Sequence, residues 1–168
     1  MPAPHRDALL RVVAPAMRDD PAFARTPTWA GQPVESSALA RMRAHPLVAA
    51  LDARGEPGTA LDIGCGAGTY STYMAGRSYR VTGVDFMPEA IALLRRQSAD
   101  SGLRVTAVEA DILVWAPPAA SDVVLDVGCL HSLGTSRHAL YKAQLLRWLA
   151  PGGDFVLVHC GRRGWWDL

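Results

Sequence analysis

The sequence has 168 residues, enough for one globular domain with its own hydrophobic core. Its 49% hydrophobic and 20% charged residues are typical of a soluble globular protein, and the net charge of +1, built from interspersed arginines, predicts no nucleic-acid partner. No apolar run approaches the roughly 18 residues of a membrane span. The N-terminus carries charge where a signal peptide would be apolar. We therefore expect a cytoplasmic protein with no membrane partner.

Residues 1–57 are predicted to form a helical segment that belongs to the same single domain. Seven of the twelve prolines precede residue 50, and helical patterning appears in DALLRVV (7–13) and in SSALARMRAHPLVAALDARG (36–55). We expect this N-terminal segment to pack as a lid over the carboxyl edge of a sheet. Trp29 either closes the lid over a ligand or is an ordinary packing anchor.

From Gly58 onward, short β-branched runs alternate with stretches of helical period. The runs lie at 59–64, 80–85, 104–111, 122–127 and 154–159, and helices are expected at 69–76, 88–102 and 136–153. The link WAPPAAS (115–121) is too short and too rich in proline for a full helix. This alternation predicts an α/β fold with a mostly parallel sheet.

A glycine-rich loop follows the first of these strands, in ALDIGCGAGTYS (60–71). Glycines at alternate positions let the backbone turn sharply and bring its amides close to a ligand. The spacing of Gly64, Gly66 and Gly68 differs from the GxGxxG of dinucleotide sites. The preceding acid, Asp62, would repel a pyrophosphate but can bind an ammonium group.

Polar residues also follow the second and third strands. Asp85 could accept hydrogen bonds from both vicinal hydroxyls of a ribose. Asp111 could accept from an exocyclic amine and the Ile112 amide could donate to a purine nitrogen, while Phe86 and Met87 could cover the ring faces. We therefore expect a ligand with a positive amine, an unphosphorylated ribose and an adenine.

Taken together, these segments resemble the class I S-adenosylmethionine-dependent methyltransferases. ALDIGCGAGTYS matches that family's first motif, VTGVDFMPEAI its second, EADI its third, DVVLDVGCLHSL its fourth, and LLRWLAPGGDFVLV the segment around the fifth strand. The resemblance covers about residues 58–160 and implies a doubly wound sheet of order 3-2-1-4-5 with helices on both faces. It also implies S-adenosylmethionine as cofactor and S-adenosylhomocysteine as product.

The resemblance assigns roles to particular residues. It implies that Asp62 and the glycine loop bind the methionine portion of the cofactor, Asp85 its ribose and Asp111 its adenine, across the switch point at the first strand. With their neighbours, the expected cofactor-binding residues are Asp62, Gly64, Cys65, Gly66, Gly68, Asp85, Phe86, Met87, Asp111, Ile112 and Gly128.

The fourth motif is expected to lie on the substrate side, so Asp126 and His131 are the candidate catalytic residues. Its GC-x-H pattern resembles the small-molecule branch that includes thiopurine and tellurite-type enzymes, which implies a small acceptor. His131 could remove a proton from a hydroxyl or amine acceptor, or it could only order its loop. Asp126 could bind cofactor or substrate, or cap the turn.

The three cysteines are expected to be free thiols, because their number is odd and no CxxC spacing occurs. Cys65 and Cys129 are interpreted as small fillers of tight turns. Cys129, His131, His159 and Cys160 could meet around a zinc ion, but their spacing fits no standard zinc pattern, so no metal is predicted.

The last strand poses a separate question, because the family's sheet continues with a helix and two antiparallel strands. These strands are apparently missing, since the sequence stops at CGRRGWWDL. An open apolar edge at 154–159 would be unusual. It could reflect a shortened chain, be covered by the tail, or pair with a second copy, and we favour a homodimer through this strand.

The function that these patterns favour is methyl transfer to an oxygen, nitrogen or sulfur atom of a small molecule, in secondary metabolism. The alternative is a non-methylating protein on the same fold that binds the cofactor or its product. A nicotinamide-dependent oxidoreductase is disfavoured by the glycine spacing and by Asp62.

Overall fold

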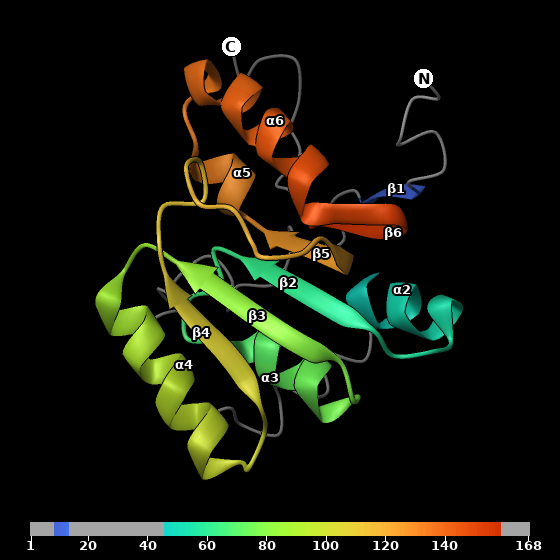
Figure 1. Ribbon diagram of the computed structural model, residues 1–168, viewed down its shortest axis with the longest axis vertical. Coiled ribbons are helices and arrows are strands. Elements are labelled where there is room, and N and C mark those ends of the chain that lie inside the picture. The colour runs from blue at the N-terminus through green and yellow to red at the C-terminus, as the bar shows by residue number, and fades with distance from the viewer. Residues whose placement is uncertain (1–8, 14–45, 159–168) are drawn as a thin grey trace, which may run out of the picture.

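The structure is a computed structural model and describes residues 9–13 and 46–158 (Figure 1). The described strands are β1 (Leu9–Val13), β2 (Thr59–Ile63), β3 (Arg80–Asp85), β4 (Val105–Glu109), β5 (Ser121–Val127) and β6 (Leu149–Val158). The described helices are α2 (Pro46–Arg54), α3 (Thr69–Gly76), α4 (Pro88–Asp100), α5 (Cys129–Ser132) and α6 (His138–Trp148), with a 3₁₀ turn at Thr135–Arg137. No described helix has the length and apolar character needed to cross a bilayer.

The strands form one parallel sheet of order β1-β6-β5-β2-β3-β4. The five strands expected from the sequence are all present, and their order 3-2-1-4-5 is confirmed as β4-β3-β2-β5-β6. The chain moves outward from β2 to β3 and β4, then returns to the other side of β2 with β5 and β6. The carboxyl end of β2 is therefore the switch point of the sheet.

Helices cover both faces of this sheet, because successive residues of a strand point to opposite sides. Ala60 packs in a buried cluster with Leu47 of α2 and Met74 of α3. Its neighbour Leu61 packs in a second cluster with Tyr141 and Trp148 of α6. Figure 1 shows α4 beside β4 at one end of the sheet and α6 above β5 and β6 at the other.

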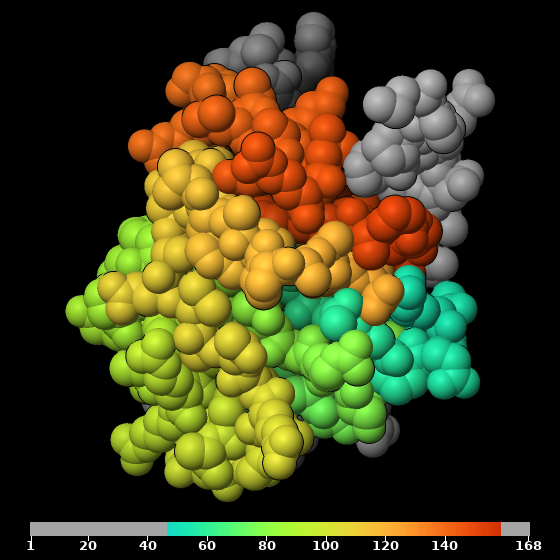
Figure 2. Space-filling model, viewed as in Figure 1, coloured from blue at the N-terminus to red at the C-terminus, as the bar shows by residue number. Residues whose placement is uncertain are grey.

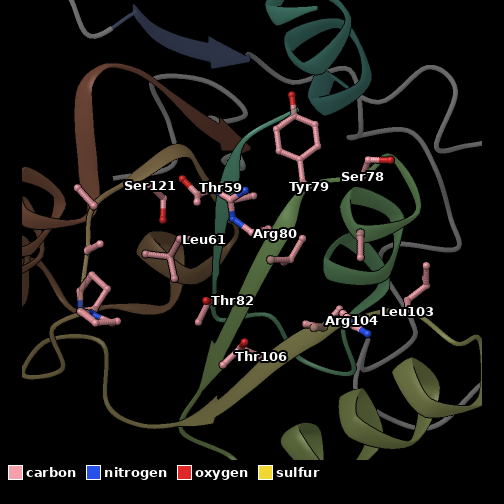
Figure 3. Close-up of a pocket in the computed structure, with 18 of the residues that line it drawn as sticks. Thr59, Leu61, Ser78, Tyr79, Arg80, Thr82, Leu103, Arg104, Thr106 and Ser121 are labelled. Atoms are coloured by element: carbon pink, nitrogen blue, oxygen red, sulfur yellow. The ribbon is translucent and has the colours of Figure 1, made fainter. Parts of the chain in front are cut away.

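The link between β4 and β5 contains no helix, as predicted. It is tied to α6 by Gln144, whose Nε2 donates to the Leu113 carbonyl at 2.7 Å, and Figure 2 shows the two segments in contact. A pocket of about 900 Å³ remains near the amino ends of β2, β3 and β4 (Figure 3). Its lining includes Thr59, Leu61, Arg80, Thr82, Arg104 and Thr106. This pocket is at the opposite end of the strands from the glycine loop.

The N-terminal segment differs from its prediction. DALLRVV was expected to be helical, but Leu9–Val13 is a strand that pairs in parallel with β6, from Leu9 opposite Asp154 to Val13 opposite Val158. A run of five residues, four of them apolar, is too short to distinguish strand from helix by periodicity. Pairing with β6, which is far away in the sequence and would otherwise have an open edge, favours the strand.

The rest of the predicted lid is described only in part. The helix α2 lies within the second stretch of helical pattern and packs on the sheet through Leu47 and Leu51. Residues 14–45, with Trp29, lie outside the described residues.

The reason given for a homodimer is wrong. It required β6 to be an open edge, whereas β6 lies between β5 and β1 of the same chain. His159, the last residue of the predicted strand, lies outside the described residues.

An ion-pair cluster between the end of α2, the start of β5 and Asp154 of β6 predicts a stability effect. Arg54, at the end of α2, donates to Asp154 Oδ2 at 3.1 Å and lies 3.4 Å from Asp122 Oδ1. We expect Arg54→Met to lower the free energy of unfolding by about 1–3 kcal/mol, because it leaves the buried Asp154 without its cation. Urea unfolding measures the change.

The matched control is Arg96→Met on α4. Arg96 pairs with Asp100 at 3.7 Å, but both side chains are mostly exposed, so this change should cost less than about 0.5 kcal/mol. Equal losses in the two variants would contradict the structural role of Arg54.

Candidate functional site

The glycine loop joins β2 to α3 in a backbone conformation that favours glycine. Gly64, Gly66 and Gly68 have φ values of 66°, 54° and 88°. A Cβ on Gly64 would lie 2.8 Å from the Cβ of Cys129, and one on Gly68 would lie 2.2 Å from Leu94 Cδ1. Among the described residues, none would lie within 4 Å of a Cβ on Gly66. Gly64 and Gly68 therefore permit close packing, whereas Gly66 leaves open space above the loop.

Gly68→Ala tests this packing. We expect it to lower the free energy of unfolding by about 2–4 kcal/mol, because alanine is strained at this φ and its methyl overlaps Leu94. Gly76→Ala is the control, since Gly76 ends α3 with open space at its Cβ position. Urea unfolding should show little change or a small gain for the control, and a Gly68→Ala variant as stable as wild type would contradict the packing argument.

Asp62 lies near the end of β2 and is 2% exposed. Its Oδ2 accepts a hydrogen bond from Ser71 Oγ of α3 at 2.6 Å. The pKa of Asp62 is raised from 3.8 to about 7, mainly by burial. The hydrogen bond from Ser71 lowers this pKa, and the nearby charges of Asp126 and Asp85 raise it. None of the ion pairs found among the described residues includes Asp62. A positive group bound here would stabilise the ionised form of the Asp62 carboxylate.

Asp85, the last residue of β3, joins the second strand to the glycine loop. Its Oδ2 accepts from the Gly66 amide and its Oδ1 from the Met87 amide, both at 2.9 Å. The Asp85 side chain therefore holds Gly66 in place. Each carboxylate oxygen has a second acceptor site, so Asp85 can still accept hydrogen bonds from a ligand.

The residues expected around an adenine lie at the carboxyl ends of β3 and β4. Asp111 is exposed, and its Oδ1 accepts from the Leu113 amide at 2.9 Å. Phe86 is 70% exposed, while Ile112 is buried and Met87 is partly buried. An exposed phenyl ring beside Asp85 is available to cover one face of a ring.

Asp126 lies at the end of β5 and is fully buried. Its Oδ1 accepts from the Cys129 amide at 2.7 Å, and its Oδ2 accepts from the Leu130 amide at 2.9 Å and from the Tyr141 hydroxyl at 2.5 Å. Of the two roles considered for Asp126, this geometry favours capping of the turn. His131 lies in the same turn and is exposed.

The acidic residues predicted from four separate motifs lie at or just beyond the carboxyl ends of four adjacent strands. The pKa of Cys129 is raised to about 12, first by burial and then by the charges of Asp126, Asp85, Asp62 and Asp111. Burial also raises the pKa of Cys65, with further contributions from Asp62 and Asp85. Both cysteines are therefore protonated at neutral pH, which favours their interpretation as packing residues over a role as nucleophiles.

Two contacts of this site were not predicted. Ser71 and Tyr141 donate to the buried carboxylates Asp62 and Asp126. The sequence contained one signal for Tyr141, a hydroxyl-bearing aromatic residue on the apolar side of a predicted helix. Of the four residues considered for a zinc site, His159 and Cys160 lie outside the described residues.

Comparison with known proteins agrees with this arrangement. The sequence model of the methyltransferase domain family matches residues 60–153. The chain belongs to this family. The matched part of the methyltransferase domain runs from β2 into β6 and contains the glycine loop, Asp85, Asp111 and Asp126.

Individual relatives match more than half of this chain. Nodulation protein S of Rhizobium tropici is 32% identical over 118 residues, covering 67% of this chain and 49% of that protein. The S-adenosyl-L-methionine-dependent Diels-Alderase iccD of Talaromyces variabilis is 32% identical over 108 residues, covering 61% of this chain and 36% of that protein. The chain spans half or less of the length of each of these curated relatives.

One solved structure shows a related protein with its ligands. The 1,6-didemethyltoxoflavin-N1-methyltransferase of Burkholderia thailandensis, with bound 1,6-didemethyltoxoflavin and S-adenosylhomocysteine, is 30% identical with a TM-score of 0.57. The alignment covers 71% of this chain and 56% of that one.

Proposed function

We propose that this methyltransferase domain binds S-adenosylmethionine across the carboxyl end of β2 and transfers its methyl group to an oxygen, nitrogen or sulfur atom of a small molecule. The observation that carries the proposal is that Asp62, Asp85, Asp111 and Asp126 stand at or just beyond the carboxyl ends of four adjacent parallel strands, beside the glycine turn. When bound, S-adenosylmethionine would supply a methyl group on a positively charged sulfur. The buried, negatively charged surroundings of Asp62 suit such a positive ligand.

The residues present fit each part of the cofactor. Asp62 would bind the ammonium group, Asp85 the ribose hydroxyls and Asp111 the exocyclic amine of adenine, with Phe86 against the ring. The open space above Gly66 would allow the ligand to approach the backbone closely.

The turn after β5 would form the acceptor side of the site. The proposed enzyme needs mainly to align the acceptor with the methyl group and to exclude water. His131 would accept a proton from a hydroxyl or amine acceptor, whereas a thiolate acceptor would need no base. A small acceptor is supported by the Burkholderia thailandensis relative, whose name gives 1,6-didemethyltoxoflavin as its substrate. A role in secondary metabolism and a cytoplasmic location are part of the same proposal.

A second candidate is a protein that uses the cofactor without methylation. The Diels-Alderase relative supports it, because its name combines S-adenosylmethionine dependence with another kind of reaction. The fold does not separate the two candidates.

Calorimetry and a transfer assay together test the proposal. Titration with S-adenosylmethionine, S-adenosylhomocysteine and NAD⁺ should show binding of the first two only. Incubation with tritiated methyl donor and a panel of small alcohols, amines and thiols should then yield a labelled product. Binding without any labelled product across the panel would favour the second candidate. Binding of NAD⁺ alone would overturn the cofactor assignment.

A further inference from the structure

We propose that Tyr141 of α6 is a positioning residue of the methyl-transfer site: its hydroxyl holds Asp126, and Asp126 holds the turn that carries Cys129 and His131. This inference rests on the proposed function, because it assigns the turn to the acceptor side of that site. Nothing in the family motifs identified Tyr141.

The contacts form a continuous chain of hydrogen bonds. The Tyr141 hydroxyl donates to Asp126 Oδ2 at 2.5 Å, and the two Asp126 oxygens accept from the Cys129 and Leu130 amides at 2.7 and 2.9 Å. Tyr141 is 3% exposed and Asp126 is fully buried. Hydrogen bonds to a buried carboxylate are charge-assisted, and loss of one leaves the charge less well satisfied.

The turn combines these bonds with partial packing, since Cys129 and Leu130 are partly buried against the core cluster that contains Tyr141 and Trp148. The helix α5 spans four residues, none of which is fully buried, and it follows Gly128 in the left-handed conformation with φ of 82°. A helix this short is not stable by itself. The Asp126 carboxylate, which accepts from two of its amides, is therefore one of the contacts that fix its position.

The turn also meets the glycine loop. A Cβ on Gly64 would lie 2.8 Å from the Cβ and 3.0 Å from the Sγ of Cys129, so the two segments are in close contact. A shift of the turn would change the wall of the cofactor site. This contact connects α6, through Asp126, to the loop that we assign to the cofactor.

The aromatic ring of Tyr141 is held independently of its hydroxyl. It packs edge-on against Trp148, with centroids 5.5 Å apart and an interplanar angle of 86°. Burial and the charge of Asp126 raise the pKa of the Tyr141 phenol, so its hydroxyl remains a donor at physiological pH. Tyr141→Phe therefore removes one hydrogen bond and keeps the packing.

Tyr79→Phe is a matched control. Tyr79 is also buried, at 6% exposure, but its hydroxyl has no hydrogen-bond partner among the described residues. Tyr79 directly precedes β3, at the end of the sheet away from the glycine loop. Both substitutions remove one buried hydroxyl, and only one of them removes a bond to Asp126.

The test combines amide hydrogen exchange of the α5 turn with calorimetric titration of S-adenosylhomocysteine. In Tyr141→Phe, the Cys129 and Leu130 amides should exchange at least tenfold faster, and the Kd for S-adenosylhomocysteine should rise about three- to tenfold. Tyr79→Phe should change neither quantity. In an Asp126→Asn background, Tyr141→Phe should have little further effect, because the two residues act through one bond.

Several outcomes would overturn the inference. It is wrong if the amides exchange at the wild-type rate in Tyr141→Phe, or if Tyr79→Phe produces the same changes. A faster-exchanging turn with unchanged ligand affinity would limit Tyr141 to a role in the fold and would also overturn it. If wild type binds S-adenosylhomocysteine and Tyr141→Phe binds it with the same Kd, only this inference is rejected. Absence of binding by wild type rejects the proposed function as well.

Discussion

Asp85→Ala is expected to raise the Kd for S-adenosylmethionine by about 10- to 150-fold. The change corresponds to about 1.5–3 kcal/mol, the usual loss for hydrogen bonds to a charged group. Asp85 has two roles in this expectation, since it would bind the ribose and its Oδ2 already holds the Gly66 amide at 2.9 Å. Isothermal titration calorimetry at fixed pH and salt measures the affinity.

The control for Asp85 is Asp100→Ala on α4, which removes a carboxylate of the same charge from a mostly exposed site. The Kd of Asp100→Ala for S-adenosylmethionine should equal that of wild type. Wild-type affinity in Asp85→Ala would remove Asp85 from the cofactor site and would leave the second motif without its assigned role.

A second prediction is that the protein loses stability as the pH rises through neutrality, because of Asp62. Burial raises its pKa from 3.8 to about 7, so between these values the folded protein keeps a proton that the unfolded chain has released. Raising the pH therefore favours unfolding. From pH 5.5 to 8.5, the contribution of Asp62 to the free energy of unfolding should fall by about 2 kcal/mol.

Asp62→Asn isolates this contribution. Asparagine retains an oxygen that can accept from Ser71, but it does not ionise. In urea unfolding, the difference between wild type and variant should grow with pH, with the variant the more stable at pH 8.5. Asp100→Asn should follow the wild-type profile. A constant difference between Asp62→Asn and wild type across this range would contradict the raised pKa of Asp62.

The same carboxylate predicts a pH dependence of cofactor binding in the opposite direction. A positive ligand binds the ionised form of Asp62, so binding near neutral pH should release a proton. Affinity for S-adenosylmethionine should rise about tenfold from pH 6 to pH 8 and then level off. Asp62→Asn should bind more weakly, with a flat profile. Together these results would mean that the ionised Asp62 lowers the free energy of unfolding and raises the affinity for S-adenosylmethionine.

Much of the candidate site could be predicted from the sequence, because the patterns that mark it span only a few residues. Gly64, Gly66 and Gly68 directly follow a strand, and the structure places all three in a left-handed conformation. Asp62 and Asp85 each stand at or next to a strand end, and parallel strands bring such ends to one edge of the sheet. The pattern of the motifs therefore predicted which acids would meet.

The contacts of Asp126 could not all be predicted from local sequence patterns. Its position near the end of β5 marked it as part of the site, and the amides that it caps are local, but its third donor, Tyr141, lies fifteen residues away on α6. No spacing rule links the two residues. The partner of a buried carboxylate follows from how a helix packs on the sheet.

By itself, the sequence determined the alternation of strands and helices, the order of the five central strands through the family resemblance, and the residues at the carboxyl edge. The alternation and the residues at the edge depend on periodicity, on glycine spacing and on turn chemistry, which act over a few residues. The tertiary structure alone decided that Leu9–Val13 is a strand and that β6 is covered by the same chain. It also decided that Asp62 is buried beside Asp85 and Asp126, with a pKa near neutrality. Edge pairing and desolvation depend on segments distant in the sequence, and only folding brings those segments together.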